Sequence, residues 1–319
     1  MAWESGVLAG LSAGGLDTRR WDLVVGTSAG AFVGARLLGD GSPDPLFAIQ
    51  TSGNDAAEEE ALQTVFGPGF VRVLRLSRRR RLRWVGLVWF AGLVLTSLMR
   101  YTMRRGIRST FSLATTLRHA VREGDWQVVA AQIGAVANTK RTGSRALTDY
   151  CERSLAPTRE WPTATLITTA VDTSDGSRAL FQASSGVPLV GAVAASVCLP
   201  GLLAPVELLG RRYIDGGLAS AANADVAAGH EEVWIVSPFG PASLDREVAE
   251  LQSSGSLVHL VRPSAAAEQA LGPGIGTMDP ARRSGAARAG FADGRAAAEA
   301  MLGEGNAVPG RVVVSGRSR

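Results

Sequence analysis

The sequence predicts an α/β protein whose mainly parallel sheet is covered by helices on both faces. Short β-prone apolar runs alternate with helix-like segments, which is typical of this class. The chain has 319 residues and 46% apolar content, enough for a large core. We expect a single domain over residues 1–319, with a basic, apolar insertion at 72–108 and a loose C-terminal tail at 303–319.

The prediction centres on residues 21–38. Residues 23–25 are a β-prone apolar run, residues 31–38 are good helix formers, and between them lies the sequence Gly26-Thr27-Ser28-Ala29-Gly30. Gly-x-Ser-x-Gly between a strand and a helix is the pattern of a nucleophile elbow, which presents a serine hydroxyl at a helix N-terminus. Ser28 is the candidate nucleophile. The alternative is a turn that only packs, or that holds a phosphate.

A second Gly-x-Ser-x-Gly match spans residues 10–14, around Ser12. It follows a helix-like segment, has no strand before it and runs into a further glycine. We therefore interpret Ser12 as the end of a helix rather than as a nucleophile.

The other elements can be predicted in chain order from periodicity and from Gly and Pro breaks. We expect helices at 3–11, 55–66, 188–198, 222–230 and 279–302, a connection at 39–54, helical structure over 110–155 with breaks at 124–125 and 141–143, hairpins at 164–171 with 178–182 and at 206–209 with 211–214, and strands at 233–236 and 257–261.

Positive charge is concentrated in one region. Residues 61–122 hold 13 arginines and no Asp or Glu, while the other 20 Lys and Arg stand against all 29 Asp and Glu. Within this region the apolar run 84–99 would be a helix of about 24 Å, short for a hydrocarbon core of about 30 Å. We expect a membrane-contacting segment whose contact residues are Arg78, Arg79, Arg80, Arg81, Trp84, Trp89 and Phe90.

Two alternatives for this region are a spanning or re-entrant segment and a buried helix with a solvated arginine rim. Nucleic acid is a poor candidate partner, because the apolar face would have no role in binding it.

Two cysteines and three scattered histidines form no disulfide framework and no metal motif, so we expect no metal and no cofactor. The N-terminus has no signal-peptide pattern, which favours a cytoplasmic location, peripheral to or anchored in the membrane.

A nucleophilic serine needs a base, and two candidates remain open. His259 would complete a Ser-Asp-His order, but it lies inside an apolar strand. Asp215 begins Asp-Gly-Gly directly after a strand, although that tripeptide is often only a turn. Reference pKa values of about 3.9 for Asp and 6.5 for His make a carboxylate the weaker base by about 3.5 kcal/mol, part of which burial recovers.

Gly-Thr-Ser-Ala-Gly at 26–30 followed by Asp-Gly-Gly at 215–217 resembles the patatin-like phospholipase family, with support from residues 5–11 and 195–201. The resemblance implies a three-layer α/β/α fold and acyl-ester lipids as substrates. It also implies Ser28 as the acylated nucleophile and Asp215 as its base, with Gly216 and Gly217 in the base loop and Gly26, Ala29 and Gly30 around the elbow and its oxyanion site.

The resemblance also implies a strand and a glycine-rich oxyanion loop ahead of residue 3, which this sequence lacks. Losing one oxyanion donor can cost about 3 kcal/mol. We therefore expect either a start upstream of Met1 or weak activity. The predicted function is a serine acyl hydrolase at a membrane surface; a non-catalytic membrane-associated protein and an acyltransferase are the alternatives.

Overall fold

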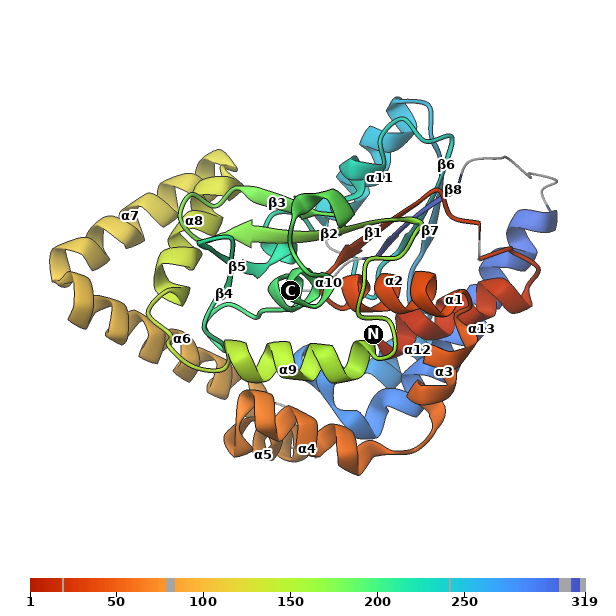
Figure 1. Cartoon of the computed structure of the whole chain (residues 1–319). Coiled ribbons are helices and arrows are strands. Elements are labelled where there is room, and N and C mark those ends of the chain that lie inside the picture. The colour runs from red at the N-terminus through yellow and green to blue at the C-terminus, as the bar shows by residue number, and fades with distance from the viewer. Residues whose placement is uncertain (19, 79–83, 241, 304–310, 316–319) are drawn as a thin grey trace.

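An eight-stranded mixed sheet lies at the centre of the molecule (Figure 1). The structure, a computed structural model, describes residues 1–18, 20–78, 84–240, 242–303 and 311–315. Along the sheet the strands follow the order β4-β5-β2-β1-β8-β6-β7, and β3 pairs with β2. Their bounds are β1 Leu23–Thr27, β2 Thr165–Asp172, β3 Arg178–Phe181, β4 Val206–Leu208, β5 Arg211–Asp215, β6 Glu232–Val236, β7 Leu257–Val261 and β8 Arg311–Ser315.

Most strands of the sheet are parallel. Strands β2, β1, β8, β6 and β7 run in one direction, whereas β3 and β5 pair antiparallel with β2 and β4 pairs antiparallel with β5. The α-helices are α1 Ala2–Ala13, α2 Ala29–Asp40, α3 Asp44–Thr51, α4 Asp55–Phe66, α5 Pro68–Ser77, α6 Trp84–Arg105, α7 Ile107–Glu123, α8 Trp126–Ala137, α9 Ser144–Leu155, α10 Leu189–Ser196, α11 Ala242–Ser253, α12 Ala265–Leu271 and α13 Arg283–Gly303.

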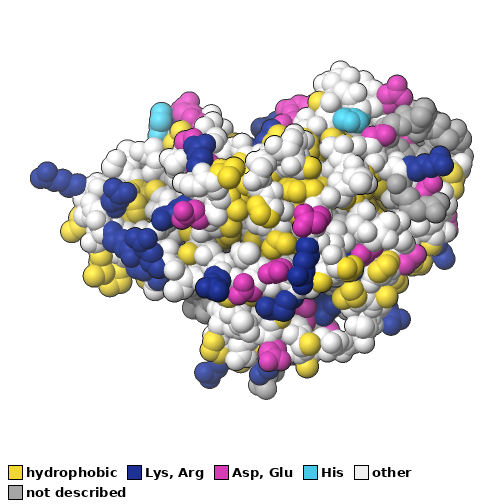
Figure 2. All heavy atoms as spheres, viewed as in Figure 1, with side chains coloured by type: hydrophobic (Ala, Val, Ile, Leu, Met, Phe, Trp, Pro, Cys, Tyr) yellow, Lys and Arg dark blue, Asp and Glu magenta, His cyan; other side chains and the backbone are white. Residues whose placement is uncertain are grey.

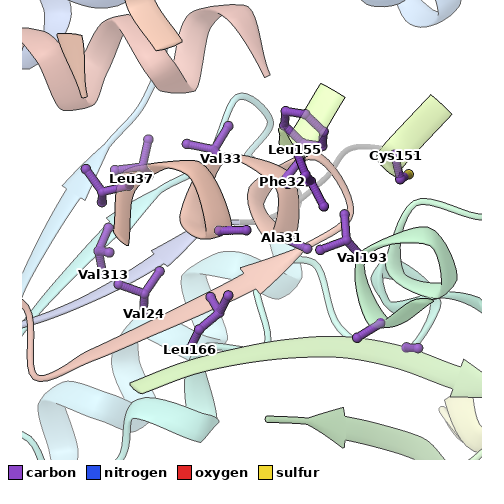
Figure 3. Packing of buried hydrophobic residues seen from close by; sticks show 14 of the residues in the cluster. Val24, Ala31, Phe32, Val33, Leu37, Cys151, Leu155, Leu166, Val193 and Val313 are labelled. Atoms are coloured by element: carbon purple, nitrogen blue, oxygen red, sulfur yellow. The ribbon is translucent and has the colours of Figure 1, made fainter. Parts of the chain in front are cut away.

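The core divides between the two faces of the sheet, and β1 contributes to both. Val24 packs into the larger cluster, under Ala31 and Val33 of α2, as Figure 3 shows. Its neighbours Leu23 and Val25 point to the opposite face and pack with residues of β6 and α11. Alternation of this kind places successive side chains on opposite faces. Helices therefore cover both faces, and the predicted three-layer α/β/α class is confirmed.

Helices α1 and α13 touch backbone to backbone. A Cβ on Gly10 would lie 2.1 Å from the carbonyl oxygen of Phe291, and one on Gly294 would lie 2.1 Å from that of Val7. Only glycine allows this approach. Gly10 belongs to the second Gly-x-Ser-x-Gly match, so helix packing explains that glycine, and Ser12 lies in the last turn of α1 as predicted.

Three sequence predictions are wrong. Residues 39–54 include helix α3, because Pro45 sits in a first helical turn, where proline is tolerated. Residues 222–230 form only a 3₁₀ turn, Ala224–Ala227, since Asn223 before it takes a left-handed conformation. The tail after residue 303 is not loose throughout: Arg311–Ser315 forms β8, which pairs with β1 and β6.

Strand β8 pairs with the strand that leads to Ser28. It pairs in parallel with β1, with Val24 opposite Val313 and Gly26 opposite Ser315. The side of β1 that faces away from β2 is therefore paired. The elbow strand therefore lies inside the sheet, between β2 and β8.

Helices α6 and α7 form the end of the molecule farthest from α1 and α13 (Figure 1). The predicted helix over residues 84–99 is confirmed and extends to Arg105. In the part of the chain that the structure describes, no helix combines the length and apolar character that crossing a bilayer requires.

Candidate active site

The turn between β1 and α2 has the geometry of an elbow. Ser28 follows the last residue of β1 and adopts φ 56° and ψ −122°, a region that non-glycine residues rarely occupy. A Cβ on Gly26 would lie 2.4 Å from Cα of Ala31, so this position requires glycine. The strained turn places Ser28 at the N-terminus of a 12-residue helix, where the helix dipole favours negative charge.

The Ser28 hydroxyl donates a hydrogen bond to Oδ2 of Asp215 over 2.7 Å. Both residues are buried, with exposed fractions of 4% and 2%. The two residues predicted as nucleophile and base thus lie in direct contact. Burial keeps water away from the pair and strengthens the hydrogen bond between hydroxyl and carboxylate.

Strand pairing explains why residues so distant in the sequence meet. Strand β2 lies between β1 and β5, with Thr27 opposite Thr169 and Asp215 opposite Ala170. Each step across a sheet is about 4.8 Å, so β1 and β5 are about 10 Å apart. The Ser28 and Asp215 side chains span this gap at the point where β1 ends.

The glycines after Asp215 orient its carboxylate. The Gly217 N–H donates to Oδ1 of Asp215 over 2.9 Å, which leaves Oδ2 for Ser28. A Cβ on Gly216 would lie 2.3 Å from the Thr169 hydroxyl oxygen, so the turn fits against β2 only with glycine there. The Asp-Gly-Gly sequence therefore fixes the direction of each carboxylate oxygen.

The end of α10 contacts both residues of the pair. The Ser28 N–H donates to the buried Ser196 hydroxyl over 2.9 Å, and the Asp215 N–H donates to the Cys198 carbonyl over 2.9 Å. Burial, and secondarily the negative charge of Asp215, raise the pKa of the Cys198 thiol to about 12. Cys198 is thus a protonated packing residue at neutral pH.

Asn223 is a residue at this site that the sequence did not indicate. Its side-chain amide is buried and donates to the Thr27 hydroxyl over 3.0 Å and to the Thr169 hydroxyl over 3.3 Å, and it lies 3.5 Å from the Gly216 carbonyl. It therefore joins the strand that leads to Ser28 with the turn that follows Asp215. The local signal in the sequence is an asparagine eight residues after Asp215, a residue type that tolerates the left-handed conformation it adopts here.

Ala29 and Gly30 complete the elbow. Ala29 is the first residue of α2, so its N–H belongs to the group that a helix leaves without an intrahelical partner. Gly30 is buried, and its carbonyl oxygen would lie only 2.7 Å from a Cβ on Gly26. The Ala29 N–H is thus a donor beside Ser28 that could face developing negative charge.

His259 is far from this site. It lies on β7, in register with Trp234 of β6, on which its ring stacks at a centroid distance of 4.3 Å. Three strand-to-strand steps of about 4.8 Å separate β7 from β1. His259 therefore cannot act as base for Ser28. Among the described residues, no group of three or more His, Cys, Asp or Glu is placed to hold a metal ion.

The predicted membrane-contact residues are only partly described. Arg78 makes a two-pronged ion pair with the buried Asp279, at 2.6 and 2.8 Å, and this pair raises the pKa of its guanidinium. It thereby anchors the end of α5 to the turn before α13. Outside the described residues lie Arg79, Arg80 and Arg81, and the side chains of Trp84, Trp89 and Phe90 at the start of α6.

The fold and this site define an α/β protein with a buried hydroxyl–carboxylate pair where the central strand of a mainly parallel sheet turns into a helix. The chain belongs to the patatin-like phospholipase family, whose sequence model matches residues 1–228 and so includes both Ser28 and Asp215. Members of this family are in general lipid acyl hydrolases. Among curated proteins, none matches the chain in sequence.

Proposed function

We propose that this protein is a serine acyl hydrolase of the phospholipase A or lipid esterase type, which cleaves acyl-ester lipids at a membrane surface with a Ser28–Asp215 dyad. The observation that carries the proposal is the 2.7 Å hydrogen bond from the Ser28 hydroxyl to the Asp215 carboxylate, made on a strained elbow. Family membership supports the choice of lipid acyl esters as substrate class.

In the first half-reaction Ser28 Oγ attacks the carbonyl carbon of the ester, and its proton moves to Oδ2 of Asp215. The carbonyl oxygen becomes an oxyanion beside the Ala29 N–H and the positive end of α2. The tetrahedral intermediate then collapses with cleavage of the ester C–O bond. Asp215 returns the proton to the departing alcohol, and the acyl group remains on Ser28.

In the second half-reaction water takes the place of the alcohol. The water oxygen attacks the acyl carbon, and Asp215 accepts a proton from that water. A second tetrahedral intermediate collapses, the bond to Ser28 Oγ breaks, and the proton returns to Ser28. The fatty acid leaves and the dyad is restored. The Gly217 N–H holds the second carboxylate oxygen in place throughout both steps.

The test is fluorophosphonate labelling of the full chain, read by intact mass, with hydrolysis of a fluorescent phospholipid measured in parallel. We expect one adduct in the wild type and none in Ser28→Ala. Asp215→Asn should lower both labelling and hydrolysis by at least 10²-fold, since no other base contacts Ser28 among the described contacts.

Two control variants match the chemistry. Ser12→Ala changes the serine of the other Gly-x-Ser-x-Gly match and should label as the wild type does. Asp279→Asn neutralises another buried carboxylate, whose partner is Arg78, and controls for a loss of stability alone. A folded wild type that takes no adduct would favour the non-catalytic reading, and product formation only with an added alcohol acceptor would favour an acyltransferase.

Membrane contact by the basic segment is the other part of the proposal. The predicted contact residues are Arg78, Arg79, Arg80, Arg81, Trp84, Trp89 and Phe90, although the ion pair of Arg78 with Asp279 gives that arginine a structural role as well. A positively charged segment next to an apolar helix suits an anionic lipid surface.

A further inference from the structure

Helices α6 and α7 carry a row of exposed apolar side chains that the fold does not use. In the described part of the chain, seven of the twelve exposed large apolar side chains lie between residues 95 and 126. Met103 is 77% exposed and Phe111 is 72% exposed. We name as the α6–α7 ridge the residues Leu95, Met99, Met103, Ile107 and Phe111.

On α6 the ridge faces away from the body of the protein. Leu95, Met99 and Met103 are spaced four residues apart, which places them within an arc of about 80° on one side of the helix. Ser97 is buried and points to the opposite side, toward Gly201 in the loop after α10. The side of α6 that packs is therefore not the side that carries the ridge.

On α7 the same division is found. Leu113 and Ala120 are buried and mark the side that packs, whereas Ile107 and Phe111 project from the opposite side. A hydrogen bond of 2.8 Å between the Thr102 and Thr110 hydroxyls joins α6 to α7 beside Gly106, where α7 begins. The two exposed apolar faces thus belong to one helical hairpin.

The ridge lies among arginines. Residues 95–122 contain six arginines, at positions 100, 104, 105, 108, 118 and 122, and no Asp or Glu. By helical periodicity Arg118 and Arg122 fall on the same face of α7 as Ile107 and Phe111, within about 60°. Figure 2 shows hydrophobic side chains next to Lys and Arg side chains at the end of the molecule formed by α6 and α7.

We propose that the α6–α7 ridge and its arginines dock this protein onto an anionic lipid bilayer, with the apolar side chains entering the headgroup region and the arginines pairing with lipid phosphates. The choice of partner rests on the proposed lipid substrate, while the surface itself is argued from exposure and charge. A second copy of the chain fits less well, because a symmetric contact would bring arginine against arginine.

This proposal differs from the sequence prediction in its residues. It adds the exposed side of α6 from Leu95 onward, and the start of α7, to the contact predicted at residues 78–90. Only described residues contribute to it. The ridge also explains why α7 carries apolar side chains on two opposite sides, which a helix that only packs does not need.

The test measures binding of the full chain, in a Ser28→Ala background so that lipid is not consumed, to sucrose-loaded vesicles of phosphatidylcholine with or without 30% phosphatidylglycerol. We expect at least tenfold tighter binding to the anionic vesicles, weakened by high salt. Met103→Ser with Phe111→Ser, and separately Arg118→Gln with Arg122→Gln, should each weaken it at least tenfold.

Two matched controls lie elsewhere on the surface. Ile49→Ser removes an apolar side chain that is 44% exposed on α3, and Arg288→Gln removes an exposed arginine on α13. Both should bind within twofold of the parent. Equal binding by parent and ridge variants would overturn the proposal. So would self-association that the ridge variants lose, because the ridge would then be an interface between copies.

A soluble substrate separates this inference from the proposed function. With Ser28 intact, the ridge variants should hydrolyse p-nitrophenyl butyrate at the rate of the wild type, which also shows that they are folded. If the wild type hydrolyses the soluble ester but does not bind the anionic vesicles, the docking proposal alone is overturned. Intact binding without hydrolysis or labelling would overturn the proposed function alone.

Discussion

The Asn223 side-chain amide donates to the Thr27 hydroxyl over 3.0 Å, so a residue beyond the Asp215 turn holds the residue just before Ser28. The same amide reaches toward the carbonyl of Gly216, which follows Asp215. One buried side chain thus contacts the sequence neighbour of each member of the pair, Thr27 before Ser28 and Gly216 after Asp215. Precise placement of reacting groups requires such supporting contacts.

We predict that Asn223→Asp lowers the rate of Ser28 labelling and the kcat for hydrolysis about tenfold or more, with a smaller effect on KM. The substitution keeps the shape and the left-handed backbone but replaces the amide donor by a carboxylate facing hydroxyl and carbonyl oxygens. Stopped-flow labelling with a fluorophosphonate, together with steady-state kinetics, measures both quantities.

Asn138→Asp is the matched control, because its amide also donates to a threonine hydroxyl, that of Thr173, over 3.0 Å. It should lower the melting temperature without lowering the labelling rate. Asn223→Gly keeps the left-handed conformation and removes the amide, so it should slow labelling as Asn223→Asp does. Equal labelling rates in all three variants would show that Asn223 only stabilises the fold.

The second prediction concerns the elbow itself. Gly26→Ala would place a Cβ 2.4 Å from the Cα of Ala31, and a backbone contact of this kind cannot be relieved by a rotamer change. We expect it to destabilise the protein by about 3 kcal/mol or more, or to prevent folding. Gly69→Ala is the control, since that helical glycine has open space around it, and it should be neutral or stabilising. Thermal unfolding of both variants tests this, and similar melting temperatures would contradict the predicted clash.

The third prediction concerns the thiols. Burial raises the pKa of Cys151 and of Cys198 to about 12. At pH 8 both thiols would be almost entirely protonated, and neither is exposed. We expect Ellman's reagent to detect no thiol in the folded protein at pH 8 and two after unfolding in guanidinium. A thiol that reacts rapidly at pH 8 in the folded protein would show that one of these sites opens.

The fourth prediction concerns acid stability. Hydrogen bonds from Arg178 to the Asp225 carboxylate, at 2.6 and 2.7 Å, lower the pKa of Asp225. Because the folded pKa lies below the unfolded value of about 3.9, this pair stabilises the protein above pH 4 and ceases to do so as the pH falls through the folded pKa.

The difference in melting temperature between the wild type and Asp225→Asn should therefore be largest near pH 6 and shrink toward pH 3. Asp245→Asn removes a more exposed ion pair, with Arg262, and should have a small effect over the same range. A difference for Asp225→Asn that grows on acidification would contradict the assigned direction of the shift.

The elbow could be predicted because its signals are local: a β-prone run, two glycines and a helix within 18 residues. The contact between Ser28 and Asp215 depends on β2 lying between their strands, and periodicity does not give strand order. The pairing of Ser28 with Asp215 was predicted instead from the family resemblance, which rests on the order of the two motifs. Asn223 was missed because it stands in a run of Ser and Ala with no periodic pattern around it.

The failures at α3 and β8 have a common cause. The prolines near residue 44, and the Gly and Arg residues after 303, favoured a prediction of irregular structure. The short segments that form α3 and β8 gave too weak a pattern to change that prediction. In α3, Pro45 belongs to the first turn of the helix it was taken to break. Strand β8 gains its stability from pairing with β1 and β6, which are distant in sequence.

The position of β8 has a consequence for the order in which the protein can be made. During synthesis β1 emerges early and β6 much later, yet both keep an unpaired edge until residue 315 has left the ribosome. Unpaired edges in the middle of a sheet are sites for mispairing and aggregation. The nascent chain must therefore hold the elbow strand in an incomplete sheet, and the sheet beside Ser28 is completed only after β8 has been synthesised.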